Sequence, residues 1–431
     1  MACIMLGWER NAARPGRIGF AVRERAQEER DAPALIEDGG EGHCLVCAGT
    51  GNGKGVAFAI PNLLAYPGGA IAVDPKGELF AVTGRHRATL GPVAVIDPFR
   101  ITDAAPGMFN PMDALDSDSA SFVDDLYALA DMLAPPASYS AKDGLFWSQS
   151  ATDVIAGTMA HVATFEGETD RSLGRVYERL TGNDVPYELA VMLDTEEPHP
   201  LATSHVGRFI NYPEITRGGI FATLCQHTRM LASAGVRHSL SGNSIDPAHI
   251  EAGAPFTIYL VMPPDKLTSH AALVRLYLTG LTSLLFRRRR KPLHPTLLLV
   301  DEAAQIGRMP SLVAATTAGR AYGIRVAWIF QSYGQLRAVY PDESDTIMEN
   351  CASMLTIGTP AVYGAARQLA DIAFGDVSAD QVFALAAGEV MARRAGGRTV
   401  IGQRLDYRTD RRFAGLYDAN PLHLPAREQA L

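Results

Sequence analysis

Short apolar runs alternate with turn residues along the first hundred positions of the chain. These runs lie at 43–48, 69–73 and 92–96, and Gly, Asp or Pro follows each of them. Their spacing leaves room for a helix between successive strands, which is typical of βαβ units and a parallel sheet. Four similar runs return later in the chain, at 256–262, 296–300, 325–330 and 352–357. The pattern predicts an α/β fold with a mainly parallel central sheet.

The segment between these two groups of strands has a different pattern. It contains longer amphipathic stretches, such as 122–133 and 150–165, with apolar residues at helical spacing. We therefore predict an all-α domain inserted into the sheet domain. The expected divisions are an N-terminal arm, the first part of the sheet domain, the insertion, the second part of the sheet domain and a C-terminal tail, at 1–41, 42–115, 116–245, 246–420 and 421–431.

Neither the N-terminal arm nor any apolar stretch has the character of a membrane segment. Residues 1–30 are rich in charge, which indicates a solvated arm or a short helix and not a targeting signal. A membrane-spanning helix needs about 20 apolar residues. The best candidate, 271–286, is shorter and contains Arg275. We expect the chain not to cross a bilayer and to contact a membrane only through a partner.

Composition and charge narrow the classes of function. The formal net charge of −8 means that any contact with nucleic acid depends on a local basic patch. Five cysteines without a signal peptide fit a reducing cytoplasm. Cys44 and Cys47 form a C-x-x-C, but no second pair lies at zinc-ligand spacing, so core packing is favoured over metal or redox use.

A glycine-rich loop follows the first of these strands. It consists of Ala48, Gly49, Thr50, Gly51, Asn52, Gly53, Lys54, Gly55 and Val56. In a strand–loop–helix order, the backbone N–H groups of such a loop surround a phosphate, and Lys54 reaches the β and γ oxygens. The loop predicts a nucleotide site for ATP. It departs from the consensus G-x-x-x-x-G-K-[ST] at Ala48 and at Gly55, and the second change removes a hydroxyl ligand for Mg²⁺.

Two acids end the strand predicted at 296–300. Strands of a parallel sheet deliver their following residues to the carboxyl edge, where ligands bind. In a P-loop enzyme Asp301 would hold Mg²⁺, directly or through water, and Glu302 would orient and deprotonate the attacking water. By itself an Asp-Glu pair is also a common helix cap. Together with Lys54, the pair favours an ATPase.

Two further polar residues lie near the next strand. Gln331 ends the run at 325–330 and can hydrogen-bond the γ-phosphate or the water. Arg320 lies on a helix-like stretch between the two strands, and its spacing fits either a surface residue or a positive charge for a neighbour's γ-phosphate.

Two other motifs have open interpretations. The basic run 287–291 is a candidate for DNA phosphate contacts, for a solvated helix end, or for contact with anionic lipid. The segment 74–78, Asp-Pro-Lys-Gly-Glu, is either a turn or a supporting part of the site.

Taken together, these motifs resemble those of the coupling proteins of type IV secretion and conjugation. The resemblance covers roughly residues 42–375. The motifs that carry it are specific in their order and spacing. They are the loop 48–56 and the segments 60–64, 73–78, 96–99, 109–113, 146–151, 300–303 and 330–332. Many members of this family are similar to the chain in having Gly after the loop lysine, at Gly55. Most members begin with transmembrane helices, and this sequence predicts none; we therefore expect a cytoplasmic variant, a protein anchored by a partner, or a truncated product.

The resemblance implies a RecA-like P-loop NTPase with an inserted all-α domain. It also implies ATP hydrolysis with Mg²⁺, a homohexameric ring, Gln331 as a sensor and Arg320 acting across the subunit interface. The expected partners are DNA or a relaxase–DNA complex and secretion channel components, at the cytoplasmic face of the bacterial inner membrane. Two rival functions stay open: a different ring DNA translocase, and a nucleotide-binding adaptor that recruits substrates without much hydrolysis.

Overall fold

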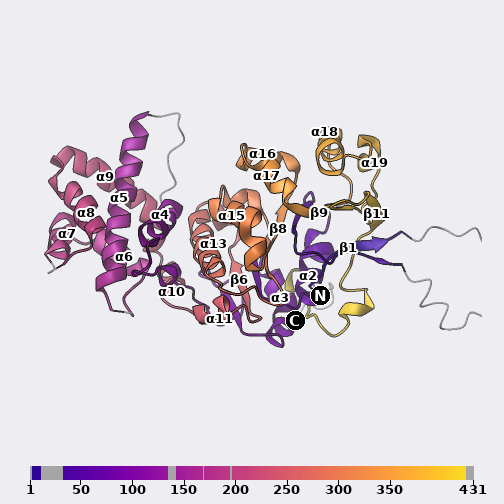
Figure 1. Cartoon of the computed structure of the whole chain (residues 1–431), viewed down its shortest axis with the longest axis horizontal. Coiled ribbons are helices and arrows are strands. Elements are labelled where there is room, and N and C mark those ends of the chain that lie inside the picture. The colour runs from indigo at the N-terminus through magenta and orange to yellow at the C-terminus, as the bar shows by residue number, and fades with distance from the viewer. Residues whose placement is uncertain (1, 11–32, 134–141, 168, 195–196, 424–431) are drawn as a thin grey trace, which may run out of the picture.

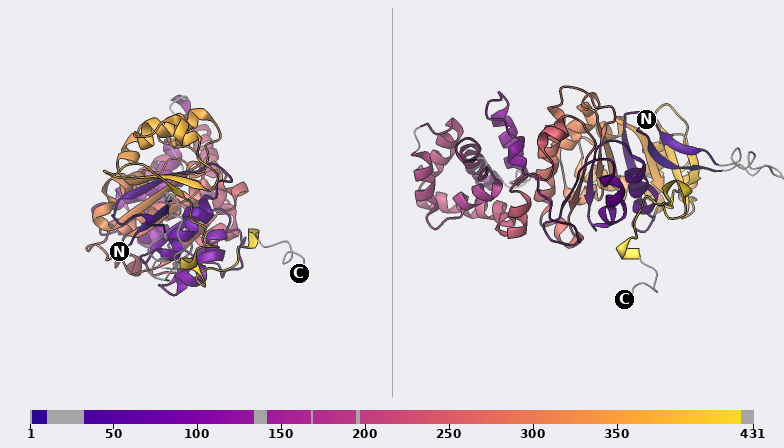
Figure 2. Two further views of the ribbon diagram at one scale, coloured as in Figure 1. Left: turned by 90° about the vertical axis from the view of Figure 1, so that its right-hand side faces the viewer. Right: turned by 90° about the horizontal axis from the view of Figure 1, so that it is seen from below.

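The computed structural model describes residues 2–10, 33–133, 142–167, 169–194 and 197–423. In the extended view of Figure 1, helices fill one end of the molecule and a helix-covered sheet fills the other. Figure 2 shows the same division from below, with both ends of the described chain on the side of the sheet. The described residues therefore form an α/β body with a helical body next to it.

One eleven-stranded sheet runs through the described part of the α/β body, in the order β2-β1-β11-β10-β9-β3-β8-β7-β4-β6-β5. Seven strands, from β9 to β5, pair in parallel, and the other four extend this sheet with antiparallel pairs. The strands are β1 (Ile4–Glu9), β2 (Leu35–Asp38), β3 (His43–Cys47), β4 (Ala70–Asp74), β5 (Val93–Ile96), β6 (Thr257–Val261), β7 (Thr296–Val300), β8 (Ile324–Phe330), β9 (Cys351–Ile357), β10 (Glu389–Arg394) and β11 (Val400–Gln403). All seven strands predicted from the apolar runs are present, which confirms the mainly parallel α/β fold.

The central strands are mainly apolar on both faces because helices cover both faces of the sheet. On one face, alternate strand residues pack against α2 (Ile60–Ala65) and α3 (Glu78–Ala88). On the other face they pack against α13 (Ala271–Phe286) and α15 (Pro310–Ala318). The remaining helices of this body are α11 (Pro247–Glu251), α12 (Pro264–Leu267), α14 (Ala303–Ile306), α16 (Tyr333–Val339), α17 (Ser344–Glu349), α18 (Tyr363–Gln368) and α19 (Ala379–Phe383).

The N-terminal segment is where the expectation from the sequence is wrong. Residues 4–9 are not a solvated arm or a helix but strand β1, whose Ile4 and Leu6 are fully buried. Strand β1 pairs with β2 and β11, and a buried Arg325 ties this hairpin to the parallel sheet. The Arg325 guanidinium donates to the carboxylate of Asp38 at 2.9 Å and to the carbonyl of Ala2 at 3.1 Å. The predicted arm also includes residues 11–32, which lie outside the described residues.

The predicted all-α insertion is present as a bundle built around one long helix, α5 (Lys142–Phe165). The other helices of the insertion are α4 (Phe122–Leu133), α6 (Leu173–Leu180), α7 (Val185–Leu193), α8 (Pro200–Asn211), α9 (Glu214–Thr228) and α10 (Ala234–Ser239). Helix α5 packs against α4, α6, α8 and α9. Contacts between α4 and α13 join the bundle to the sheet body.

In the described parts of the chain, no helix is long and apolar enough to span a membrane. The best sequence candidate, α13, is instead a core helix whose Arg275 donates to the Ile306 carbonyl at 2.9 Å.

Candidate active site

The phosphate loop follows β3, which lies between β9 and β8 in the sheet. It leads into a helical run that starts as a π-helical turn at Gly55–Ala59 and continues as α2. Gly51 and Gly53 have φ values of +84° and +80°, a backbone conformation that residues other than glycine rarely adopt. The Asn52 side chain donates to the Ile357 carbonyl at 2.8 Å and so fixes the loop to the end of β9. The loop therefore has a defined shape at the carboxyl edge of the sheet.

Lys54 lies between the two acids that follow β7. Its ammonium is 3.0 Å from Asp301 Oδ1 and also contacts Glu302 Oε1. Burial works to lower the pKa of Lys54, but the two carboxylates outweigh it and raise that pKa above its ordinary value. Burial also raises the pKa of Asp301, and the charge of Lys54 opposes this rise. The structure thus places a permanent positive charge beside the phosphate loop.

The backbone of Glu302 aims its side chain into the site. Its φ of +52° lies in the left-handed region, which is uncommon for a residue other than glycine. The Glu302 N–H donates to Asp301 Oδ1 at 2.9 Å, which closes the turn between β7 and α14. The resulting orientation brings the Glu302 carboxylate to Lys54 and to the side chain of Gln331, which donates to Glu302 Oε2 at 2.9 Å.

Lys54, Asp301, Glu302 and Gln331 therefore come together, although they are far apart in sequence. Strands β3, β7 and β8 end at one edge of the parallel sheet, and β8 lies between the other two. Strands β7 and β8 deliver the polar residues that follow them to this edge, and the loop after β3 brings Lys54 there. The Gln331 backbone is held in turn by Gln335, whose Oε1 accepts from the Gln331 N–H at 2.9 Å.

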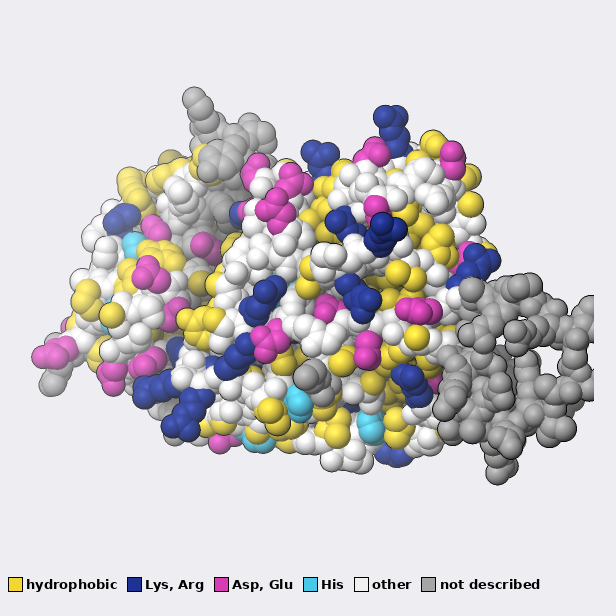
Figure 3. All heavy atoms as spheres, turned by 45° about the vertical axis from the view of Figure 1, so that its right-hand side comes forward, with side chains coloured by type: hydrophobic (Ala, Val, Ile, Leu, Met, Phe, Trp, Pro, Cys, Tyr) yellow, Lys and Arg dark blue, Asp and Glu magenta, His cyan; other side chains and the backbone are white. Residues whose placement is uncertain are grey.

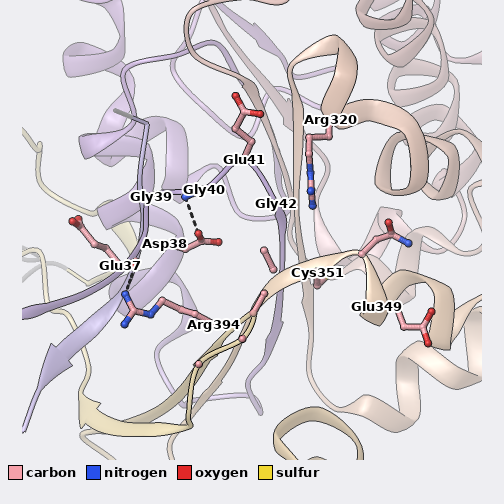
Figure 4. A pocket seen from close by; sticks show the side chains of 15 residues that line it. Glu37, Asp38, Gly39, Gly40, Glu41, Gly42, Arg320, Glu349, Cys351 and Arg394 are labelled. Atoms are coloured by element: carbon pink, nitrogen blue, oxygen red, sulfur yellow. Dashed lines mark hydrogen bonds between the residues drawn. The ribbon is translucent and has the colours of Figure 1, made fainter.

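Arg320 lies at the amino edge of the sheet, where the parallel strands begin, opposite the carboxyl edge that carries Lys54. It comes before β8, in the 3₁₀ turn Gly319–Tyr322, and its side chain is exposed. Figure 4 shows it reaching toward Gly42, which precedes β3, in a pocket that also contains Cys351 at the start of β9. Because these strands are parallel, their full length separates Arg320 from Lys54 within one chain.

Two charged side chains without a role assigned from the sequence also border the loop. A Cβ placed on Gly53 would be 3.1 Å from the guanidinium of Arg404, and one placed on Gly55 would be 3.1 Å from Glu78 Oε1. Glu78 belongs to the segment 74–78, for which the sequence leaves open a turn or a supporting part of the site. No sequence signal points to Arg404, because the pairing of β10 with β11 brings it to the loop.

The oxygen-rich surroundings of the loop fit a magnesium ion that binds with a nucleotide. In the described part of the chain, no three Asp, Glu, His or Cys side chains are grouped so that they could hold a metal ion alone. Asp74 ends β4 and Asp301 follows β7, and these neighbouring strands align Val73 with Val300. Asp74 Oδ1 is buried without a hydrogen-bond partner. Mg²⁺ at phosphate sites takes one or two carboxylates and completes its shell with phosphate oxygens and water.

The basic run 287–291 does not act as one patch. Arg288 is buried, and its guanidinium donates to the Ile250 carbonyl at 3.0 Å and to the Thr296 hydroxyl at 2.8 Å. Lys291 pairs with Glu41, whereas Arg289 and Arg290 are exposed. On the face of the molecule shown in Figure 3, positive side chains are scattered among acidic and apolar ones. Part of this run therefore serves the fold.

A parallel sheet with a glycine loop after one strand and paired acids after a nearby strand is the arrangement of P-loop nucleotide-binding proteins. Within that class, the chain belongs to the family described as Type IV secretory system Conjugative DNA transfer, which it matches over residues 16–371. This match confirms the resemblance drawn from the sequence motifs.

Curated relatives and solved structures agree with this family. The chain is 29% identical over 356 residues to a conjugal transfer protein TraG of Agrobacterium fabrum (strain C58 / ATCC 33970), covering 76% of this chain and 53% of the relative. It is 25% identical over 308 residues to a type IV secretion system-coupling protein VirD4 of Bartonella quintana (strain Toulouse), covering 69% of this chain and 47% of the relative. The chain thus spans about half the length of the curated relatives it matches.

The fold is similar to that of the conjugative coupling protein TrwB. Its unbound form has a TM-score of 0.65 at 16% identity and covers 87% of this chain and 86% of TrwB. A plasmid coupling protein TrwB in complex with ADP and Mg²⁺ has a TM-score of 0.63 at 16% identity, with 84% of each chain covered.

Proposed function

We propose that this chain is the ATP-hydrolysing motor of a coupling protein, which brings DNA or a nucleoprotein to a type IV secretion channel. The observation that carries the proposal is the convergence of Lys54, Asp301, Glu302 and Gln331 beside the phosphate loop. The family match and the names of the relatives, conjugal transfer and secretion-coupling proteins, support the transport role.

In this proposal the loop 48–56 and Lys54 bind the phosphates of ATP. Lys54 is paired with carboxylates in the structure, and the γ-phosphate competes with Glu302 for its charge. Glu302 is then free to accept a proton from the attacking water while the bond from the γ-phosphorus to the bridging oxygen breaks. Gln331, already bonded to Glu302, moves with it and senses the γ-phosphate.

Asp301 is the residue proposed to hold Mg²⁺, directly or through a water molecule. When bound, the ion neutralises phosphate charge that develops in the transition state. The carboxylate of Asp301 is the hard oxygen ligand that this ion prefers.

Arg320 is proposed to act in trans. At the amino edge of the sheet it is out of reach of its own chain's Lys54, so it can complete only the site of another subunit. This role requires a ring, which we propose to be a homohexamer with nucleotide between subunits. In this scheme residues 42–115 and 246–420 form the nucleotide-binding domain, and 116–245 form the inserted domain.

The proposed partners are single- or double-stranded DNA or a relaxase–DNA complex, together with channel components at the cytoplasmic face of the inner membrane. Contact with the membrane is proposed to run through a partner. Among the described residues, Arg289 and Arg290 are the exposed arginines of the basic run that are open to DNA phosphates.

Steady-state phosphate release by the purified chain, with and without single-stranded DNA, tests the proposal. A motor hydrolyses ATP and is stimulated by DNA. Nucleotide binding without turnover would instead favour the adaptor function, for which Gly55 is the specific observation, because it removes a metal ligand from the loop.

A further inference from the structure

Gly55 stands where P-loop proteins carry a hydroxyl side chain, and the structure fills that place from another element. Glu78 Oε1 lies 3.1 Å from the position that a Cβ on Gly55 would take. A serine or threonine at residue 55 would therefore press against this carboxylate. The glycine and the glutamate are spatially complementary, since the space left by one holds the functional group of the other.

The position of Glu78 is set by the start of helix α3 and by the C-terminal segment. It is the first residue of α3, after Gly77 with φ of +70°, and the Phe80 N–H donates to Asp74 Oδ2 at 2.9 Å. On the far side, the amide of Asn420 donates to Glu78 Oε2 at 3.2 Å. One carboxylate oxygen is thus anchored by the C-terminal segment, while the other faces the phosphate loop.

The surroundings of Glu78 suit a divalent cation. Asp74, four residues earlier, is buried and leaves Oδ1 without a hydrogen-bond partner. Asp74 and Asp301 lie on the same face of the sheet as α2 and α3, because Ala72 and Leu299, two residues before them, pack in that core. The acidic side chains at this edge thus border the loop on the side where its missing hydroxyl would stand.

We propose that Glu78 supplies the oxygen ligand that Gly55 cannot, so that the cation of a bound nucleotide is held by Glu78 and Asp301. The inference rests on the proposed nucleotide function and adds a role for the segment 74–78. A carboxylate is a harder and more strongly binding ligand for Mg²⁺ than a neutral hydroxyl. The absence of a hydroxyl at residue 55 therefore does not abolish the cation site of this chain.

The first test measures the affinity of the purified chain for a fluorescent ATP analogue, once with Mg²⁺ and once with EDTA. In the parent chain Mg²⁺ should tighten binding. Glu78→Gln should leave the affinity in EDTA within about twofold and reduce the Mg²⁺ enhancement by about tenfold, the effect of one charge-assisted ligand. Glu214→Gln, an exposed residue of the helical insertion, is the matched control and should keep the full enhancement.

The second test exchanges the two side chains. Gly55→Ser in the parent chain should weaken binding, because the new side chain meets Glu78. Glu78→Ala combined with Gly55→Ser should regain part of the Mg²⁺ enhancement that Glu78→Ala alone loses. Mn²⁺ in place of Mg²⁺ gives an independent readout, since its electron paramagnetic resonance spectrum changes when a protein ligand to the nucleotide-bound ion is lost.

The outcomes separate this inference from the proposed function. If the parent chain binds no nucleotide under either condition, the proposed function fails. If the parent chain binds, but Glu78→Gln weakens binding equally with Mg²⁺ and with EDTA, Glu78 has only a structural role. A Glu78→Gln variant that keeps the full Mg²⁺ enhancement also overturns the inference.

Discussion

Glu302 shows how one strained residue organises the site. It is one of two non-glycine residues with positive φ in the described part of the chain, the other being Arg100. Such a conformation costs on the order of 1–3 kcal/mol and persists where surrounding contacts hold it. Here the contacts are Lys54 and Gln331, which are also the residues proposed to meet the γ-phosphate. The strained residue thus lies at the site proposed to respond to nucleotide.

Lys54 is the residue whose loss should be most severe. Lys54→Ala removes the ammonium between Asp301 and Glu302 and leaves two carboxylates facing the incoming phosphates, so nucleotide binding should be abolished. Titration with a fluorescent ATP analogue measures this. Lys266→Ala, a partly exposed lysine of α12, should bind as the parent does, and an unchanged affinity in Lys54→Ala would refute the assignment.

Asp74 should give the stability of the fold a specific dependence on pH. Burial raises its pKa from 3.8 to about 7. The unfolded chain loses this proton near its ordinary pKa, but the folded chain keeps it until about 7, so stability falls as the pH rises between these values. Asp74→Asn cannot ionise, and its advantage over the parent should grow over this range to at most about 4 kcal/mol.

Urea denaturation at several pH values between 4 and 8 measures this difference. Above the folded pKa the advantage of the variant should level off. A constant difference between Asp74→Asn and the parent would show that Asp74 ionises normally in the folded protein.

At the scale of residues, the sequence predicts the polar side chains at the ends of buried strands but not those that reach the loop from elsewhere. Asp301, Glu302 and Gln331 lie directly after apolar runs, so the parallel topology alone brings them to the edge where Lys54 lies. Glu78 is positioned by the end of β4 and by Asn420, a contact between residues 342 positions apart. No local pattern encodes such a contact.

At the scale of elements, the same reasoning explains which strands the sequence predicts. Strands β3 to β9 are mainly apolar because both of their faces are covered. Strands β1, β2, β10 and β11 are antiparallel and end in charged or polar residues, and β1 pairs with partners on either side of it that lie far apart in the chain. These strands pair with partners that meet only in the assembled sheet, which no local pattern shows. From the sequence alone, the charge of the N-terminal segment therefore predicts an arm.

A substitution in strand β1 tests whether this strand is buried in the sheet. Leu6 is fully buried in it, so Leu6→Ala should destabilise the protein by roughly 2–5 kcal/mol. A solvated arm would tolerate the change. Leu293→Ala is the control, since Leu293 is 90% exposed and should cost less than about 0.5 kcal/mol. Equal midpoints of thermal unfolding for the two variants would contradict the placement of β1.

At the scale of the whole molecule, the two edges of the sheet carry complementary parts of one proposed site. Lys54 and the acids lie at the carboxyl edge, and Arg320 lies at the amino edge. In the proposed ring the amino edge of one subunit would face the carboxyl edge of the next, so that two chains together would complete the site. Because the chain is acidic overall, the proposed DNA contact would depend on exposed local groups such as Arg289 and Arg290.

Mixing of subunits tests Arg320 in trans. Arg320→Ala alone should lose turnover by roughly 10³-fold or more while it still binds ATP. When Arg320→Ala and Glu302→Gln subunits are combined, some interfaces pair an intact Glu302 with an intact Arg320, so phosphate release should partly return. Mixed rings that form and stay as inactive as either variant alone would return Arg320 to a surface role.

The most direct test of the proposed motor is steady-state phosphate release by the parent chain and by Glu302→Gln, compared at saturating ATP. The Glu302 side chain, which contacts both Lys54 and Gln331, is the proposed general base. We expect Glu302→Gln to keep its ATP affinity within a few-fold and to turn over roughly 10² to 10⁴ times more slowly. Turnover at the parent rate would contradict this assignment.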